Sequence, residues 1–225
     1  MSFINIEKLK FIAKRIYHKE YFNTVKKKIH GQNNKIKYNR SSILKKVIFD
    51  IVGSNNIIEI GDNCYLKNVK FYIRGNNHKI FIGDKVRFNE GGVLWFEDNE
   101  GVLKIGNETS FENIHIAVTE PKSSIFIGED CMFAYDIELR TGDSHSIIDV
   151  ESKKRINFAK DIKIGNHVWV AAHNLILKGC TISDNNVIAT GSILTKTFEK
   201  RGVILAGNPA KIVKENITWS RERIK

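Results

Sequence analysis

Aliphatic side chains recur at every sixth position in one stretch of the chain, between residues 164 and 196. The positions are Ile164, Val170, Ile176, Ile182, Ile188 and Leu194. An amphipathic helix has an apolar period near 3.6 and a half-buried strand a period of 2, so a period of six indicates a short strand and a turn that repeat. Units this short cannot bury a face alone, and we expect them to stack into a solenoid.

A second column of small or medium-sized residues follows four positions after each aliphatic one. Its members are Val168, Asn174, Cys180, Asn186 and Ser192. We expect both columns to point into the solenoid. The three cysteines, Cys64, Cys131 and Cys180, all occupy this inward position. Because a thiol buried in apolar surroundings holds little thiolate, we interpret them as packing residues and not as nucleophiles.

The repeat extends toward the N-terminus with a longer period. The segments 44–62 and 66–84 align without gaps at a shift of 22 residues, and the Ile-Gly pairs begin at Ile60, Ile82, Ile105, Ile127 and Ile164. A coil of eighteen residues with one corner lengthened by four or five explains these spacings. On the third face of the early coils, Phe71 and Ile73 compete for the inward position, as do Ile116 and Val118, and the pattern leaves the phase open.

The repeat stops in the polar segment 140–163, which contains RTGDSHSIIDVESKKRINFAKD. We expect this segment to leave the solenoid as a loop, and long loops in compact repeats are usually functional or disordered. His145 is the only histidine in it.

These hexads, the segment AGNPAKIVK at 206–214 and the Asp-Ser-His of the loop resemble the hexapeptide-repeat acyltransferases, most closely the bacterial capsular polysaccharide and sialic acid O-acetyltransferases. The resemblance covers residues 44–214. It implies an all-β solenoid, a left-handed parallel β-helix. The handedness rests on the resemblance alone, because ordinary parallel crossovers are right-handed. We expect a basic helical extension at 1–35, the β-helix at 36–205 with a catalytic loop at 140–163, and a tail with a short helix at 206–225.

The resemblance also implies a reaction. A sugar hydroxyl attacks the thioester of acetyl-coenzyme A while a neutral imidazole, here that of His145, removes its proton. The backbone N–H of Ala172 would stabilise the oxyanion. Trp169 would lie beside the acetyl donor, although packing at a subunit boundary is the alternative. Asp143 either orients His145 or caps the loop, and both interpretations stay open. Ser144 and Arg155 are the candidate substrate contacts of the loop.

By the same resemblance, coenzyme A lies along the later coils. Thr190, Thr195 and Lys196 would contact its pantetheine and adenine end, and Lys211 and Lys214 would approach its phosphates, where point positive charges suit phosphate. The resemblance further implies a homotrimer with each active site between two subunits, and no metal.

The charge of the chain is concentrated at its start. Residues 1–50 hold thirteen lysine or arginine residues against three acidic ones, a net charge of +10 out of +11 for the whole chain. Few aromatic residues are interleaved with the basic ones, which argues against nucleic-acid binding. Apolar stripes at Leu9, Ile12 and Ile16 and at Phe22, Val25 and Ile29 favour two short helices. They would pack on the solenoid or contact an anionic membrane or polymer.

We found no apolar run long enough to span a bilayer and no signal-peptide pattern, so we expect a cytoplasmic protein, at most peripheral at the inner membrane face. Three alternatives remain from the sequence. Transfer to an amino sugar nucleotide would make the chain an N-acetyltransferase. His145, His167 and His173 could hold zinc as in a carbonic anhydrase, but the last two are six residues apart and should lie on successive faces of one coil, where they do not converge on one metal. A non-catalytic solenoid scaffold is the third alternative.

Overall fold

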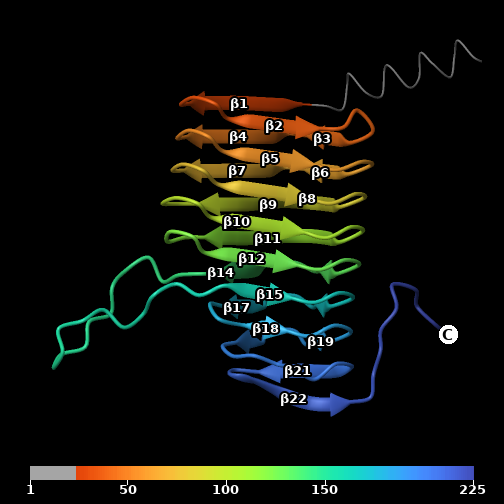
Figure 1. The fold of residues 1–225 in the computed structure, drawn as a ribbon. Coiled ribbons are helices and arrows are strands. Elements are labelled where there is room, and N and C mark those ends of the chain that lie inside the picture. The colour runs from red at the N-terminus through yellow and green to blue at the C-terminus, as the bar shows by residue number, and fades with distance from the viewer. Residues whose placement is uncertain (1–23) are drawn as a thin grey trace, which may run out of the picture.

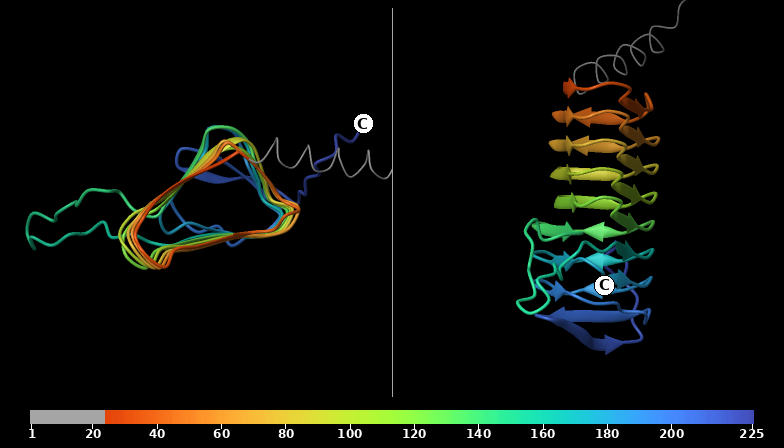
Figure 2. Two further views of the ribbon diagram at one scale, coloured as in Figure 1. Left: turned by 90° about the horizontal axis from the view of Figure 1, so that it is seen from above. Right: turned by 60° about the vertical axis from the view of Figure 1, so that its left-hand side comes forward.

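Each turn of the chain contains three short strands separated by corners, and successive turns stack in register to form a triangular parallel β-helix (Figures 1 and 2). The structure is a computed structural model that describes residues 24–225. The expected helical stripe at Leu9, Ile12 and Ile16, with Phe22, lies outside the described residues.

The strands fall on three faces. The first face is a seven-stranded sheet made of β2 (Lys35–Tyr38), β5 (Ile57–Ile60), β8 (Lys79–Ile82), β10 (Val102–Ile105), β12 (Ser124–Ile127), β15 (Ile162–Ile164) and β18 (Thr181–Ile182). The second face holds β3 (Ile43–Lys45), β6 (Tyr65–Lys67), β13 (Met132–Phe133), β16 (Trp169–Val170), β19 (Val187–Ile188) and β21 (Val203–Gly207). The third face holds β1 (Val25–His30), β4 (Val47–Val52), β7 (Val69–Arg74), β14 (Ile137–Arg140), β17 (Leu175–Leu177) and β20 (Ile193–Leu194). Two longer strands, β9 (Arg87–Phe96) and β11 (Ser110–Val118), turn the corner between the second and third faces.

The third face explains the long period of the early coils. Its strands there are six residues long, as in β4 and β7, whereas β17 in the later coils has three. Residues that pair between adjacent coils are accordingly 22 positions apart in the early coils, as Ile48 and Lys70 are, but 18 apart in the later ones, as Lys163 and Thr181 are. Because a strand of six has room for three inward side chains, Phe71 and Ile73 are both buried. The two residues that competed for the inward position in the sequence pattern therefore both point inward, from the same strand.

The two predicted columns both lie in the core. The aliphatic positions from Ile164 to Leu194 are at most 4% exposed, and the second column from Val168 to Ser192 is at most 2% exposed. Phe111 stacks between two phenylalanines of the adjacent coils, with ring centroids 4.5 Å from Phe88 and 4.8 Å from Phe133. Each fully buried side chain of this size contributes about 1.5–3 kcal/mol of transfer free energy. Burial of such side chains in every coil along the axis stabilises the solenoid.

The three cysteines are buried, as predicted. Burial raises the pKa of the Cys131 thiol to about 12 and that of Cys180 to about 11. Burial also raises the pKa of Cys64. These thiols fill space between coils, and their protonated state at neutral pH excludes them as nucleophiles.

Both ends of the described chain differ from the sequence expectation. Val25 and Ile29, expected in a helix, lie in strand β1, which pairs in parallel with β4. Without β1, the backbone groups at the edge of β4 would lack partners. Hydrogen bonding to them stabilises this segment more than a short helix would, because short helices are only marginally stable. The expected C-terminal helix is also absent from 206–225. Strand β22 (Ala210–Glu215) instead forms an antiparallel hairpin with β21, and residues 216–225 continue without helix.

The tail after β22 runs back along the corner between the first and second faces. The indole N–H of Trp219 donates to the carbonyl of His167 at 2.8 Å, and the two rings stack with centroids 4.2 Å apart. Arg221 pairs with Asp130 at 2.9 Å and donates to the carbonyl of Cys131. Contacts to three coils hold the tail extended, which is why a ten-residue helix does not form. Among residues 24–225, no helix is long and apolar enough to cross a membrane.

Candidate functional site

The interruption of the repeat is a loop of residues 141–161 between β14 and β15. Figure 1 shows it leaving the solenoid at the corner between the third and first faces and extending well beyond the coils. The loop was predicted at 140–163. It is shorter at both ends, because Arg140 belongs to β14 and residues 162–163 belong to β15. An antiparallel bridge between Ile148 and Arg155 closes the outer part of the loop. His145 lies before this bridge, at the base of the loop, and is exposed to solvent.

The base of the loop is held by one buried amide, that of Asn157, which is 8% exposed. Its nitrogen donates to the carboxylate of Asp143 at 2.8 Å and to the carbonyl of His145 at 2.7 Å. Its oxygen accepts from the backbone N–H of Ile147 at 2.7 Å and from Nε of Arg155 at 3.1 Å. An amide has two donors and an acceptor oxygen with two lone pairs, so every hydrogen-bonding position of Asn157 is used to fix the chain on both sides of His145.

Asp143 belongs to the same cluster. Burial alone would raise the pKa of Asp143, but the hydrogen bonds from Lys178 and Asn157 and the charge of Lys178 outweigh it and hold the pKa below its usual value. Lys178 pairs with the carboxylate and also donates to the carbonyl of Asn157 at 2.9 Å. Of the two interpretations left open by the sequence, these contacts favour anchoring of the loop, because the carboxylate is bonded to Lys178 and Asn157.

Arg155, a candidate substrate contact, ties the returning strand of the loop to the preceding coil. Its guanidinium pairs with Glu120 at 2.5 Å, and Glu120 also accepts from the backbone N–H of Ala159 at 3.3 Å. Ser144, the other candidate, has a backbone φ of +64° and an exposed side chain. We call Asp143, Asn157, Lys178, Arg155 and Glu120 the loop anchor.

Two hollows flank the base of the loop. His145, Ser146 and Arg155 line one of about 330 Å³ together with Glu97, Asp98, Thr119, Glu120, Pro121 and Ser144. The second, of about 320 Å³, opens on the third face beside it. The two share Glu97, Thr119 and Ser144 as lining residues. A small polar molecule held in either hollow would therefore lie beside the base of the loop.

Three of the predicted donor residues lie on other edges of the triangle than the loop. Trp169 is in β16 on the second face, and Ala172 follows at the corner between the second and third faces. Thr190 is exposed at that same corner one coil later, where the N–H of Gly191 donates to the carbonyl of Ala172 at 3.0 Å. The loop projects from a different corner, as the view along the axis in Figure 2 makes clear. Within one subunit, the structure therefore does not bring His145 and Trp169 together.

The remaining candidates for coenzyme A are exposed but dispersed. Thr195 and Lys196 follow β20 at the corner from which the loop leaves two coils earlier, and the ammonium of Lys196 lies 5.7 Å from the ring centroid of Phe198. Lys211 and Lys214 are in the final strand, β22. Ala172 and Thr190 share one corner, Thr195 and Lys196 another, and Lys211 and Lys214 lie in the last strand, so the structure does not gather the predicted set at one place.

Trp169 has a neighbour that the sequence analysis missed. The ring of Trp219 from the tail lies 6.1 Å from that of Trp169, and Trp219 in turn stacks on His167. His167 completes this contact through a hydrogen bond between Nδ1 and Asp130 at 2.7 Å. No repeat position marks Trp219, so the sequence pattern carried no signal for it.

The histidines considered for zinc are separated. His167 pairs with Asp130, and His173 pairs with Asp136 at the next corner, at 2.8 Å. In the part of the chain from residue 24 onward, no three His, Cys, Asp or Glu side chains gather as a metal site would require.

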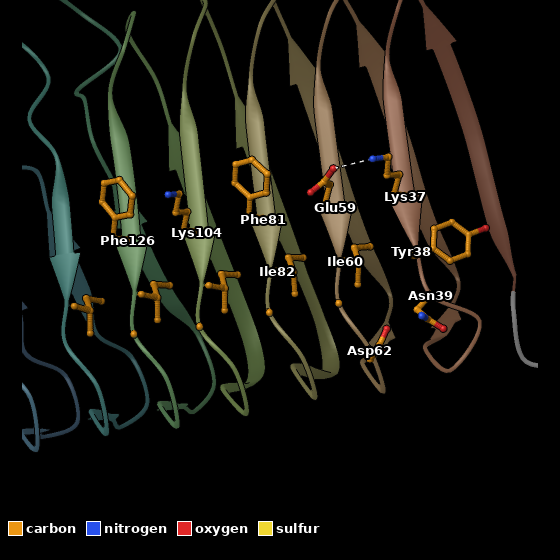
Figure 3. A pocket seen from close by; sticks show the side chains of 17 residues that line it. Lys37, Tyr38, Asn39, Glu59, Ile60, Asp62, Phe81, Ile82, Lys104 and Phe126 are labelled. Carbon is orange, nitrogen blue, oxygen red and sulfur yellow. Dashed lines mark hydrogen bonds and ion pairs between the residues drawn. The ribbon is translucent and has the colours of Figure 1, made fainter.

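A shallow groove of about 860 Å³ runs along the first face. Figure 3 shows the side chains along it, with Lys104 between Phe81 and Phe126. None of the predicted site residues lines this groove. We therefore place the candidate site at the base of the loop and not in this groove.

Comparison with known proteins gives a consistent result. No protein-family model matches the sequence. Among curated proteins, the chain is 44% identical over 117 residues to a polysialic acid O-acetyltransferase of Escherichia coli O1:K1 / APEC, which is 52% of this chain and 38% of that protein. It is 38% identical over 120 residues to the polysialic acid O-acetyltransferase of Neisseria meningitidis, which is 53% of this chain and 55% of that protein. The matched region thus spans about half the length of these relatives or less.

Two solved structures match over most of the chain. The polysialic acid O-acetyltransferase OatWY superposes with a TM-score of 0.81 at 35% identity, over 90% of this chain and 93% of that one. The polySia-specific acetyltransferase NeuO superposes with a TM-score of 0.74 at 32% identity, over 88% and 82%. This likeness confirms the left-handed parallel β-helix that we predicted for the solenoid.

Proposed function

Because the chain belongs to the hexapeptide-repeat family of capsule O-acetyltransferases, we propose that it transfers the acetyl group of acetyl-coenzyme A to a sugar hydroxyl of a bacterial capsular polysaccharide. The proposal is supported by the names of its relatives, polysialic acid O-acetyltransferases, and by the exposed histidine at the base of the loop. His145 is the group that carries the chemistry.

The mechanism is direct attack. The imidazole of His145 accepts the proton of the acceptor hydroxyl as its oxygen bonds to the acetyl carbon, and the thiolate of coenzyme A leaves as the carbonyl re-forms. A hydroxyl without such a base is a poor nucleophile near neutral pH, and a positioned base contributes about 10²- to 10⁴-fold in rate. The loop anchor supports this role because it holds the backbone on both sides of His145. The three buried, protonated thiols leave no cysteine for an acetyl-enzyme.

The donor half of the site would come from another subunit. Trp169 and the N–H of Ala172 lie on a different edge of the triangle from His145, so a site that uses all three needs a second chain. A homotrimer with three such shared sites fits a triangular solenoid and the preference of oligomers for closed symmetry. Ala172 would then supply the N–H for the developing oxyanion.

The single observation behind the proposal is the presentation of His145 on an anchored loop, and its test is an acetylation assay. Purified protein is incubated with acetyl-coenzyme A and oligosialic acid, and coenzyme A release and the mass of the glycan are followed. We expect release that depends on the glycan and a product that loses acetyl in mild alkali, as an ester does. An alkali-stable product would indicate N-acetylation instead, and no turnover with any carbohydrate would contradict the proposal.

A further inference from the structure

An outward column of side chains on the third face leads to the base of the loop. In register along neighbouring strands, it runs from Tyr72 to Trp95, Ala117 and Arg140. Residues in such a column are about 4.8 Å apart from coil to coil. Large flat side chains therefore stack on one another, and a small residue in the column leaves a gap.

Trp95 is covered on one side only. Tyr72 stacks on it with ring centroids 4.0 Å apart. The guanidinium carbon of Arg74 lies over the ring of Tyr72, 3.9 Å from its centroid. Arg74 is itself held by Asp50 at 3.0 Å. On the other side of Trp95 the next residue of the column is Ala117. Its methyl group is too short to stack on the indole ring. The second face of the indole is thus open.

The gap above Ala117 is the second hollow, of about 320 Å³. Trp95 forms one wall and Arg140 the opposite one, with Ala117 as the floor. His115 lies on one side, with its ring roughly perpendicular to that of Trp95 and the centroids 6.2 Å apart. The volume is at the lower end of the range of about 300–1,000 Å³ typical of ligand pockets. A slot of this kind accepts a flat ring of modest size.

The guanidinium of Arg140 has hydrogen-bond donors that the described residues do not use. One of its terminal nitrogens pairs with Glu138 at 2.7 Å, and Glu138 also lies 3.5 Å from Nδ1 of His115. Nε of Arg140 is buried and has no hydrogen-bond partner among the residues that the structure describes, and only one of the two terminal nitrogens is paired. Since a guanidinium offers five donors in a planar fork that matches a carboxylate, Arg140 retains donors for a ligand.

We propose that this slot binds one acidic sugar ring of the acceptor glycan, with the C–H face of the ring on Trp95 and its carboxylate on Arg140. The inference rests on the proposed function, because it takes the ligand to be the acceptor. Stacking on an indole suits the apolar face of a pyranose, and the guanidinium suits its acid group. The slot and the hollow of His145 share Ser144 and Thr119, so a ring in the slot delivers the hydroxyls of its own or the adjoining sugar to His145.

The test uses two substitutions that act in opposite ways. Trp95→Ala removes the stacking wall, and Ala117→Leu fills the slot while leaving Trp95 in place. With oligosialic acid as the acceptor, we expect both to raise KM for the glycan about three- to tenfold, the loss expected for one aromatic contact or its obstruction. KM for acetyl-coenzyme A should stay within twofold. Phe126→Ala, a half-exposed phenylalanine of the first face, is the matched control and should leave both KM values unchanged.

Binding without turnover separates this inference from the proposed function. Saturation-transfer NMR of oligosialic acid with the full chain, without acetyl-coenzyme A, should detect sugar protons in contact with the protein, and the signal should weaken in both variants but stay unchanged in Phe126→Ala. If the protein acetylates glycans and Trp95→Ala keeps its KM, the slot is wrong and the function stands. If the glycan binds in the slot but is never acetylated, the slot stands and the function fails. A neutral dextran oligosaccharide that binds equally well would overturn the role of Arg140.

Discussion

The coils and the loop are stabilised in opposite ways. In the coils, every side chain of an inward column repeats the contact of its neighbour, as Phe111 does between Phe88 and Phe133. In the loop, residues 141–161 are held at their base by a few polar side chains around Asn157. The coils therefore spread their stability over many equivalent positions, whereas the geometry around His145 depends on one cluster. Substitutions in the two regions should separate folding from activity.

The largest expected effect is that of removing the base. His145→Ala should lower kcat by about 10²- to 10⁴-fold, the usual contribution of a positioned general base. Its unfolding midpoint in urea should stay close to that of the unchanged protein because His145 is exposed. Steady-state kinetics with oligosialic acid and acetyl-coenzyme A provide the measurement. A loss of less than tenfold, or radiolabelled acetyl retained on the protein in the absence of acceptor, would point to another base or to a covalent route.

The corresponding change in the coils is Phe111→Ala. A cavity between two stacked rings should cost about 3–5 kcal/mol in the free energy of unfolding, measured by urea titration. Phe111 lies on the inner side of the second face and away from the loop, so kcat of the folded protein at low temperature should change less than twofold. A large fall in kcat at full folding would show that the two regions are coupled.

Asn157 tests the loop anchor itself. Asn157→Ala leaves Asp143, Ile147 and the carbonyl of His145 without their shared partner, and a displacement of about 1 Å at a catalytic group can cost about 10²-fold. We expect kcat to fall about 10- to 100-fold while KM for acetyl-coenzyme A is unchanged. Ser152→Ala, which removes a hydrogen bond to Asp149 in the outer part of the loop, is the control and should leave kcat unaltered. Equal kinetics in both variants would remove Asn157 from the positioning of His145.

The inward columns could be predicted because a six-residue period directly reports which side chains point inward. The loop could be predicted because that period fails there. The phase of the third face could not, because the sequence does not reveal that Phe71 and Ile73 share one longer strand. The sequence singles out Asp143 and Arg155 but not the loop anchor that they form with Glu120, Asn157 and Lys178. These five residues are brought together by folding and not by any spacing, and a buried asparagine in a polar segment carries no signal of its own.

The ends of the chain show the same limit. The apolar spacing of Val25 and Ile29 also fits a helix, but the open edge of β4 selects the strand. In the tail, Trp219 and Arg221 find partners on three earlier coils, and such contacts across some ninety residues leave no local pattern. Local propensity was overridden in both places by partners distant in sequence.

A smaller effect is expected from the charge pair of the anchor. The pKa of Asp143 is lowered in the folded protein, so its contribution to stability is fully present above the unfolded pKa and is lost as pH falls through the lower folded value. Because the carboxylate is partly exposed, Asp143→Asn should cost only about 1 kcal/mol near pH 7. Urea titrations of both proteins should converge as pH falls below about 4. A difference that persists unchanged there would assign the effect to packing and not to the charge.

The smallest effect concerns the thiols. With a pKa of about 12 for Cys131, on the order of 10⁻⁴ of this thiol is ionised at pH 8. Iodoacetamide should therefore leave the folded protein unmodified at pH 8, with activity unchanged, and should label all three cysteines after unfolding in urea. Mass spectrometry of the intact chain reads the outcome. Rapid labelling of one cysteine in the folded state, with loss of activity, would reopen the question of a nucleophile.

The separation of His145 from Trp169 on different edges of the triangle leads to the central claim, that each site combines two subunits. The most direct test mixes His145→Ala and Trp169→Ala chains, each nearly inactive alone, and re-forms the oligomer from the unfolded mixture. If a site takes His145 from one subunit and Trp169 from its neighbour, random trimers regain about a quarter of the activity of the unchanged protein. If the mixture stays as inactive as its parents while light scattering shows that mixed trimers have formed, the site lies within one chain and the account is wrong.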